Sequence, residues 1–351
     1  MEAKTVMCSY LSRKMSKVRW KPDYDVPCSK FLTGSWGESS QRLPNVEEIQ
    51  GNAVQLWKYI PNMDPIPLYT MEHAGDVTEL KFIDTNSFLV SSSQGTLQLG
   101  QIVHDKDETF FNIKSLNSWS NIHAYKNGTP SSLTSFARSK NGVVTVGDDG
   151  RLVVISLDNP TPLCSIEDPF NSAIKCVSFI DHKSVITGNA LGSLKVWDLS
   201  SGQPKPVFSL PSTLKLVSIN FIQQKPSQQH LLFVGSDDGS ITVWDMRNTD
   251  SPIILNTAHN ESVSELQFHP ENPNHFFTCS TLGELWHWDM KQDTATLHQW
   301  RGDTLNERLN VTALAEPLYL PLNSLDVVAE SVITTCDNEA TYIISKPLSV
   351  L

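Results

Sequence analysis

Short apolar stretches alternate with small-residue turns along most of the chain. The clearest unit lies at 215–258, where four such stretches occur, KLVSINFI, LLFVGS, SITVWDM and PIILNTA. Short runs with period-two alternation predict β-strands, and the Asp-Asp-Gly turn at 237–239 predicts a tight hairpin between the second and third stretches. The unit is therefore predicted to be a four-stranded antiparallel sheet.

Seven copies of this unit occur along the chain. The third stretch closes on Trp-Asp in three of them, Trp197-Asp198, Trp244-Asp245 and Trp288-Asp289. Weaker copies lie at 90–102 and 145–157, and the first and last, at 33–59 and 335–346, are the most eroded. A repeat of roughly 40–45 residues ending in Trp-Asp is the signature of a WD40 blade. The sequence thus predicts an all-β fold, a single seven-bladed WD40 β-propeller over residues 1–351.

The blade limits follow from the spacing of the copies. We expect blades one to seven at 13–75, 76–130, 131–170, 171–212, 213–259, 260–302 and 303–351, with the fourth strand of blade six near 296–300. The last blade supplies only three strands of its own. Because an open sheet edge invites pairing with other chains, we predict that the N-terminal strand within residues 1–12 completes blade seven and closes the ring.

Three connections are longer than the repeat requires. They are the inserts 37–52, 103–130 and 299–322. Loops of this length are either functional or disordered, and loops carry most binding residues. The first and the last insert are our candidates for partner contacts.

The recurring tryptophans have a structural explanation, since one slot is filled in blade after blade. In WD40 repeats the indole bonds a second-strand Ser or Thr, which leads to a His and then to an acid in the tight turn. Blade six offers His259 and Ser280 but has Leu282 where the acid is expected, and blade five offers Ser236 and Asp238 but no His. Blade two keeps only His73 and serines, so we expect blades four to six to be the most rigid. The predicted structural residues are Trp57, His73, Trp197, Asp198, Ser236, Asp238, Trp244, Asp245, His259, Ser280, Trp288 and Asp289.

Composition narrows the function classes. The formal net charge of -11 argues against nucleic acid as a direct ligand, and 39% hydrophobic residues are enough for a large core. The six cysteines form no C-x-x-C pair, which favours a reducing compartment. We find neither a secretory leader pattern nor an apolar run long enough to insert into a membrane. Catalytic and phosphate-loop motifs are also missing, so we expect no enzyme activity, no catalytic, cofactor-binding or metal-ligating residues, and no cofactor.

Several stretches around the repeats are more distinctive than the Trp-Asp pairs. They are SKVRWKP at 16–22, FLTGSW at 31–36, HAGDVTELKF at 73–82, FHPENPNHFFTCSTLGELWHWD at 268–289 and NSLDVVAESVITTCDNEATYI at 323–343. Together they resemble the WD40 nucleoporins of the forty-three kilodalton type, subunits of the Y-shaped outer-ring scaffold complex of the nuclear pore. The resemblance covers both ends of the chain and weakens at 103–130 and 299–322.

This resemblance implies a non-catalytic scaffold subunit located at the nuclear envelope, in the nuclear pore complex. Its partners would be other nucleoporins of the Y-complex, especially an α-solenoid subunit, with the propeller itself monomeric inside the hetero-oligomer. Such a subunit would support pore assembly and the transport of protein and mRNA, and in mitosis it would associate with kinetochores where the organism shares that arrangement.

Two alternatives from other classes stay open. Trp244-Asp245-Met246-Arg247 matches the W-D-x-R pattern of propellers that act as substrate receptors of cullin-type ubiquitin ligases, where Arg247 would contact the adaptor. The negative charge would also suit a propeller that binds histone peptides.

Overall fold

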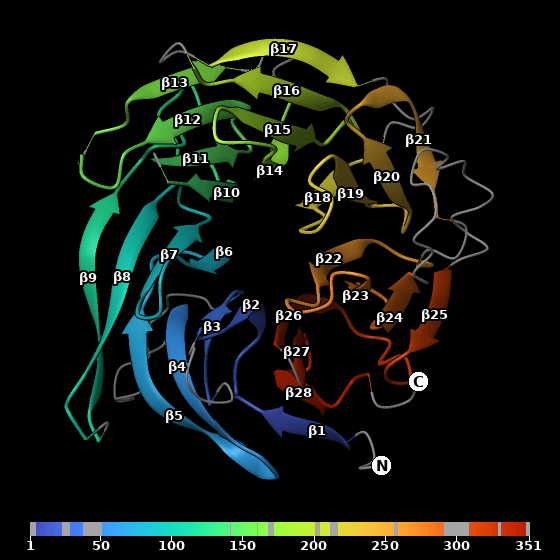
Figure 1. The fold of residues 1–351 in the computed structure, drawn as a ribbon. Coiled ribbons are helices and arrows are strands. Elements are labelled where there is room, and N and C mark those ends of the chain that lie inside the picture. Colours follow the sequence, from blue (N-terminus) through green and yellow to red (C-terminus); the bar gives the residue numbers. More distant parts are fainter. Residues whose placement is uncertain are drawn as a thin grey trace. The chain divides into compact units, whose positions relative to one another are not determined.

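The structure is a computed structural model of the 351-residue chain. It describes residues 5–22, 29–37, 51–107, 109–140, 142–159, 161–167, 172–200, 204–210, 217–255, 259–290, 309–328 and 331–348. Within these ranges the regular elements are strands, 28 in all, arranged as seven four-stranded antiparallel sheets (Figure 1). No helix in the described part of the chain has the length and apolar character needed to span a bilayer.

The chain divides into two compact units. The unit formed by 7–173 and 333–343 contains three complete sheets. Their strands are β2 (Met15–Trp20), β3 (Lys30–Ser35), β4 (Ala53–Ile60) and β5 (Met63–Glu72), then β6 (Val77–Phe82), β7 (Ser87–Ser92), β8 (Leu97–His104) and β9 (Phe111–Trp119), then β10 (Leu133–Ser139), β11 (Gly142–Gly147), β12 (Arg151–Ile155) and β13 (Cys164–Glu167).

The unit formed by 1–6, 174–332 and 344–351 contains the next three sheets. Their strands are β14 (Ile174–Phe179), β15 (Ser184–Asn189), β16 (Leu194–Asp198) and β17 (Lys205–Leu210), then β18 (Ile219–Gln224), β19 (Leu231–Ser236), β20 (Ile241–Asp245) and β21 (Asn248–Ile254), then β22 (Val263–Phe268), β23 (His275–Ser280), β24 (Leu285–Met290) and β25 (Leu309–Ala313).

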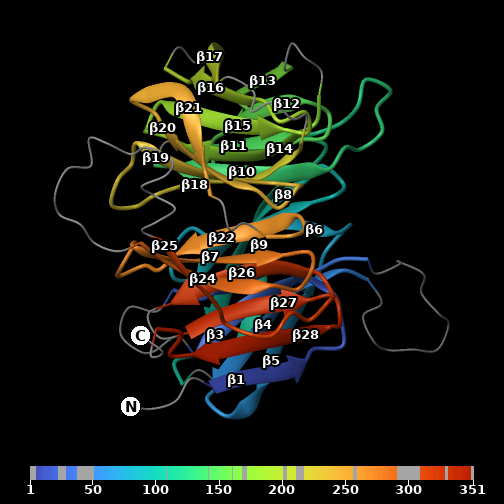
Figure 2. The ribbon, with the colours of Figure 1, turned by 90° about the vertical axis from the view of Figure 1, so that its right-hand side faces the viewer.

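The seventh sheet joins the two ends of the chain. Its order is β1-β28-β27-β26, with β1 at Thr5–Tyr10, β26 at Leu322–Val328, β27 at Ser331–Cys336 and β28 at Ala340–Ser345, and Figure 2 shows β1 beside β28. The Leu11 amide donates to the Glu339 carbonyl at 2.8 Å, and the Thr341 hydroxyl donates to the Ser9 carbonyl at 3.4 Å. The predicted completion of the last blade by the N-terminal strand is confirmed, as is the all-β, seven-bladed propeller.

The predicted end of blade six is wrong. Its fourth strand is β25, which pairs with β24 so that Val311 faces Trp288, and it lies beyond the expected positions 296–300 and beyond the expected blade limit at 302. The extra residues therefore precede the outer strand rather than follow it. Sequence alternation could not show this, because TLHQW at 296–300 reads as a strand as well as LNVTA at 309–313 does.

The other two inserts differ in what the structure shows. In the insert 103–130, β8 and β9 extend into a longer hairpin, and an isolated bridge joins Ala124 to Pro130. Most of the insert 37–52 lies outside the described residues, as do positions 299–308 of the last insert.

The core lies between the faces of neighbouring sheets. One cluster joins Phe233 of β19 to Phe268 and Phe276 of the next sheet, with Trp288 stacked on Phe276 at 5.3 Å between ring centroids. Burial of each such side chain contributes roughly 1.5–3 kcal/mol, so these apolar faces hold successive sheets together.

Candidate functional site

A single threonine position on the second strand receives the indole of the third-strand tryptophan. Trp57, Trp197 and Trp288 donate from Nε1 to the hydroxyls of Thr33, Thr187 and Thr278 at 2.9, 2.9 and 2.8 Å. In each sheet the threonine faces the residue two positions before the tryptophan. The ladder register therefore aims every indole at its acceptor, as expected for buried tryptophans that need a polar partner.

Blade six extends this contact into a buried network. His259 Nε2 lies 2.7 Å from the Thr278 hydroxyl, and His259 Nδ1 lies 2.8 Å from a carboxylate oxygen of Glu284. The Ser280 hydroxyl donates to the same oxygen at 3.1 Å. Glu284 thus provides the acid that seemed to be missing at Leu282. The acid stands two residues later, on the third-strand side of the turn.

Burial and charge act against each other in this network. Burial lowers the pKa of His259, and the contact with Glu284 only partly opposes that shift. For Glu284, burial alone would raise the pKa, but hydrogen bonds from His259, Asn260 and Ser280 bring it below the usual value. The network is therefore most stable with Glu284 ionised and His259 neutral.

Blade three carries the same network without a tryptophan. His123 Nδ1 lies 2.9 Å from Asp149, and His123 Nε2 lies 2.9 Å from the Thr145 hydroxyl. Ile155 occupies the register position that the tryptophans hold elsewhere. The repeat pattern predicts a degenerate blade here and does not reveal His123, Thr145 and Asp149. The signal was present, because Thr-x-Gly, Thr-x-Asn and Thr-x-Ser close the second strands of several blades.

Blade five departs from its prediction. Val234 stands at the threonine position, and no described group accepts a hydrogen bond from the buried Nε1 of Trp244. Ser236 and Asp238 belong to the tight turn instead, where Asp238 accepts from the amide and hydroxyl of Ser240. The sequence predicts Ser236 and Ser280 as indole acceptors, but both lie two residues beyond the threonine position, which is Val234 in blade five and Thr278 in blade six.

His73 of blade two is buried, and Val90 stands at the second-strand position that a threonine holds in other blades. Neither ring nitrogen has a hydrogen-bond partner among the described residues. Burial lowers the pKa of His73 to about 4, and interactions with Ser91, Gln98 and Asp76 oppose the shift only in part. His73 is therefore a neutral core residue of the blade.

The aspartates that follow the tryptophans contact residues in the adjacent turn or on the neighbouring strand. Asp198 accepts from the amide and hydroxyl of Ser200, and Asp289 lies 3.6 Å from Nδ1 of His275. Asp245 binds the Arg247 guanidinium from two residues away, with Nη2 at 2.6 Å and Nε at 3.0 Å. That contact lowers the pKa of Asp245 and raises the pKa of Arg247. Arg247 is about half exposed, so it is accessible while its guanidinium is engaged by Asp245.

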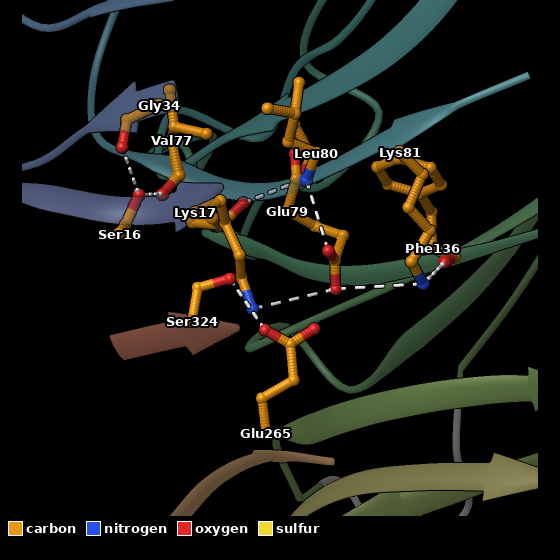
Figure 3. Close-up of polar contacts among 12 residues, drawn as sticks. Ser16, Lys17, Gly34, Val77, Glu79, Leu80, Lys81, Phe136, Glu265 and Ser324 are labelled. Carbon is orange, nitrogen blue, oxygen red and sulfur yellow. Dashed lines mark hydrogen bonds and ion pairs between the residues drawn. The ribbon is translucent and has the colours of Figure 1, made fainter. Parts of the chain in front are cut away.

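Polar side chains on the first strands link neighbouring sheets (Figure 3). In one unit the Ser16 hydroxyl donates to the Val77 carbonyl at 2.6 Å, and Arg19 Nη2 forms a buried ion pair with Glu79 at 3.1 Å. In the other unit the Ser324 hydroxyl donates to Glu265 at 2.7 Å. Glu79 and Glu265 hold the same place in the stretches VTELKF and VSELQF. These buried contacts join one pair of neighbouring sheets within each unit.

The described residues include no group of three or more His, Cys, Asp or Glu side chains arranged to hold a metal ion. The polar clusters that the structure brings together are the blade networks and the first-strand contacts. Exposed residues lie in the loops and on outer strands such as β17. What this geometry offers chemically is a rigid support for binding surfaces.

Comparison with known proteins agrees with this geometry. A family model described as "WD domain, G-beta repeat" matches residues 206–245. Nucleoporin Nup43 of Mus musculus is 30% identical over 392 aligned residues, which cover 96% of this chain and 98% of the mouse protein. Nucleoporin Nup43 of Homo sapiens is 28% identical with the same coverage, and nuclear pore complex protein nup43 of Dictyostelium discoideum is 30% identical over 44% of this chain and 36% of its own length. With a seven-bladed fold and similarity that runs from end to end, the chain belongs to the Nup43 family of nucleoporins.

Proposed function

We propose that this chain is a non-catalytic scaffold subunit of the nuclear pore complex, located at the nuclear envelope within the Y-shaped outer ring. The observation that carries the proposal is the similarity to the mouse and human nucleoporins over 96% of the chain. A likeness confined to one blade would support only a general WD40 role. This one includes the ends of the chain and the connections between blades.

The chemistry of the blade networks supports a scaffold role. His123 and His259 each have both ring nitrogens engaged by partners within their own blade. A general base must reach a substrate proton directly or through one water, and both histidines are buried together with their threonine partners, Thr145 and Thr278. The networks stabilise the blades and leave recognition to the loops.

The finer parts of the proposal concern partners and processes. We propose that the direct partners are other nucleoporins of the Y-complex, chiefly an α-solenoid subunit, and that one propeller takes part in each hetero-oligomer. Through this scaffold the chain would support pore assembly and the transport of protein and mRNA. Association with kinetochores in mitosis is the part of the proposal that depends on the organism.

Affinity purification of the tagged full-length chain from native extract tests the proposal. We expect co-purification of several nucleoporins, and staining of the tagged chain at the nuclear rim. Recovery of a cullin and its adaptor without any nucleoporin would contradict the proposal and favour the ligase-receptor alternative. Recovery of histones alone would favour the peptide-reader alternative.

A further inference from the structure

An exposed aromatic residue is held in place on the loop between β25 and β26. Tyr319 has a φ of +55°, which is uncommon for a residue other than glycine, and its side chain is 75% exposed. The neighbouring Leu320 is 44% exposed. The Leu318 amide donates to the Gly283 carbonyl at 3.1 Å, which fixes the loop on the turn between β23 and β24.

Gly283 makes this close approach possible. Its φ is +85°, and an added Cβ would lie 2.7 Å from the Leu320 carbonyl oxygen and 2.9 Å from the Tyr319 amide nitrogen. The loop conformation is thus set by backbone contacts and does not depend on a partner. A tyrosine on a backbone that is already positioned loses less entropy on binding than one on a mobile loop, and tyrosines are enriched among interface residues that carry binding energy.

The loops next to Tyr319 are acidic. Asp237, Asp238, Glu261 and Glu316 are exposed, and the segments 236–240, 259–263, 280–284 and 314–321 contain no Lys or Arg. Among the described residues no salt bridge reaches Asp237, Glu261 or Glu316. Exposed acids elsewhere do pair, as Glu167 does with Lys126 and Arg151.

Backbone contacts join these loops into one surface. An added Cβ on Gly239 would lie 2.8 Å from the Glu261 carbonyl oxygen, so the turn with Asp237 abuts the connection between β21 and β22. That connection reaches the next turn through Asn260, whose Nδ2 donates to Glu284 at 3.1 Å. In antiparallel sheets these turns and connections all lie at the end where the first strands begin. We call residues 237–239, 259–261, 281–284 and 316–320 the acidic loop surface.

Charge and shape together indicate the occupant. Acidic residues on the loops beside an exposed tyrosine complement a segment that carries Lys or Arg beside an apolar side chain. Phosphate backbones and anionic lipid surfaces would be repelled. A second copy of this chain is also disfavoured, since each copy carries a formal net charge of -11.

We propose that the acidic loop surface binds a basic segment of a partner protein in the nuclear pore assembly, with Tyr319 and Leu320 as apolar anchors. This inference rests on the proposed function, because it names the surface through which the scaffold subunit holds a partner. Residues 316–320 of this surface lie in the part of the insert 299–322 that the structure describes.

Variants of the full-length chain test this surface by co-purification from native extract. E261Q with E316Q removes two charges, Y319A removes the anchor, and E271Q is a matched control in the turn at the opposite end of the β22–β23 pair. Each variant is first compared with the parent by thermal melting. We expect nucleoporin recovery to fall about fivefold for the charge variant and at least tenfold for Y319A, and to stay unchanged for E271Q.

A photo-reactive amino acid at position 319 identifies the bound segment, with position 207 on β17 as the exposed control. We expect cross-links from 319 to nucleoporin peptides rich in Lys or Arg, and none of that kind from 207. If the parent chain recovers nucleoporins while both variants recover as much, or if 319 cross-links to acidic peptides, this inference is wrong and the proposed function stands. If the parent recovers no nucleoporin, the proposed function itself has failed.

Discussion

The hydroxyl of Thr278 in blade six makes hydrogen bonds with two buried side chains at once. Trp288 Nε1 donates to it at 2.8 Å, and His259 Nε2 lies 2.7 Å away. Thr187 in blade four has the same place and receives the indole of Trp197, but its hydroxyl donates to the Lys195 carbonyl at 3.5 Å instead of contacting a histidine. The two positions therefore allow the histidine contact to be separated from the indole bond.

We predict that T278V lowers the free energy of unfolding by about 2–4 kcal/mol, because two buried polar groups lose their partner while the side-chain volume is kept. T187V, which leaves one indole without an acceptor, should lower it by about 1–2 kcal/mol. Urea unfolding of the two variants and the parent measures both values. Equal losses would show that His259 adds nothing to the hydroxyl contact.

Val234 offers the opposite test, since the buried Trp244 indole lacks an acceptor among the described residues. A threonine at Val234 would place a hydroxyl where Thr33, Thr187 and Thr278 have theirs. We predict that V234T raises the free energy of unfolding by about 1 kcal/mol. V146T is the control. Val146 is also buried, but it pairs with Leu152, and a hydroxyl there would have no tryptophan indole to accept a hydrogen bond from. It should destabilise the chain, and a loss for V234T of the same size would contradict the prediction.

At the scale of the element, the blades differ in how their histidines respond to acid. His73 has a pKa lowered to about 4 by burial, so between pH 6.5 and 4 the unfolded chain binds a proton that the folded chain does not. Stability linked to His73 is therefore fully present above pH 6.5 and is lost as the pH falls below it. His259 and His275 shift in the same direction, because burial lowers the pKa of each.

We predict that unfolding free energy measured by urea falls between pH 7.5 and pH 5, with His73 contributing about 2 kcal/mol of the loss. In H73L that part of the pH dependence should disappear, while the part linked to His259 and His275 remains. H104Q, which changes an exposed histidine, is measured alongside as the control for a His substitution. An H73L curve parallel to that of the parent would show that His73 is not buried as a neutral ring.

The strand β1 is the element that carries the closure of the seventh sheet. It pairs with β28, and its Ser9 hydroxyl also donates to Asp64 at 2.8 Å in the β4–β5 hairpin region. We predict that deletion of residues 1–12 leaves the edge of β28 unpaired and yields a chain that melts at lower temperature and aggregates. Deletion of residues 1–4, which precede β1, should change neither property. Thermal melting with light scattering distinguishes the two, and a 1–12 deletion that melts cooperatively at the parent temperature would refute the closure.

The sequence was sufficient for the repeat, the strand alternation and the closing strand, because each depends on local pattern or on counting strands. It was not sufficient for partners set by register. Thr278 rather than Ser280 receives the indole because Thr278 pairs with Trp286, two residues before Trp288, whereas Ser280 lies two residues further along β23 on the same face. Glu284 and Asp149 lie at different offsets in their turns, so no fixed spacing would have found both acids.

For the whole molecule, the repeat explains why chemistry and recognition are separated. Buried hydroxyls, imidazoles and carboxylates satisfy one another inside the blades, and the first-strand contacts of Ser16, Glu79 and Glu265 fix neighbouring sheets. Exposed acids such as Asp237, Glu261 and Glu316 lie in the loops. The proposed scaffold would select its partners by the charge and the apolar anchors that its loops present.

Arg247 separates the nucleoporin assignment from the ligase-receptor alternative. Its guanidinium is half exposed and is bound by Asp245 from two residues away, so its removal leaves one partly exposed carboxylate without that partner. We predict that R247A recovers nucleoporins from native extract at the parent level and melts at the parent temperature. D245N, which releases the guanidinium instead, should behave in the same way. If R247A abolished recovery of a cullin adaptor that the parent chain binds, Arg247 would be a partner contact and the W-D-x-R match would be functional. Because the two readouts come from one purification, a variant that lost both would point to misfolding, which the melting curve would reveal.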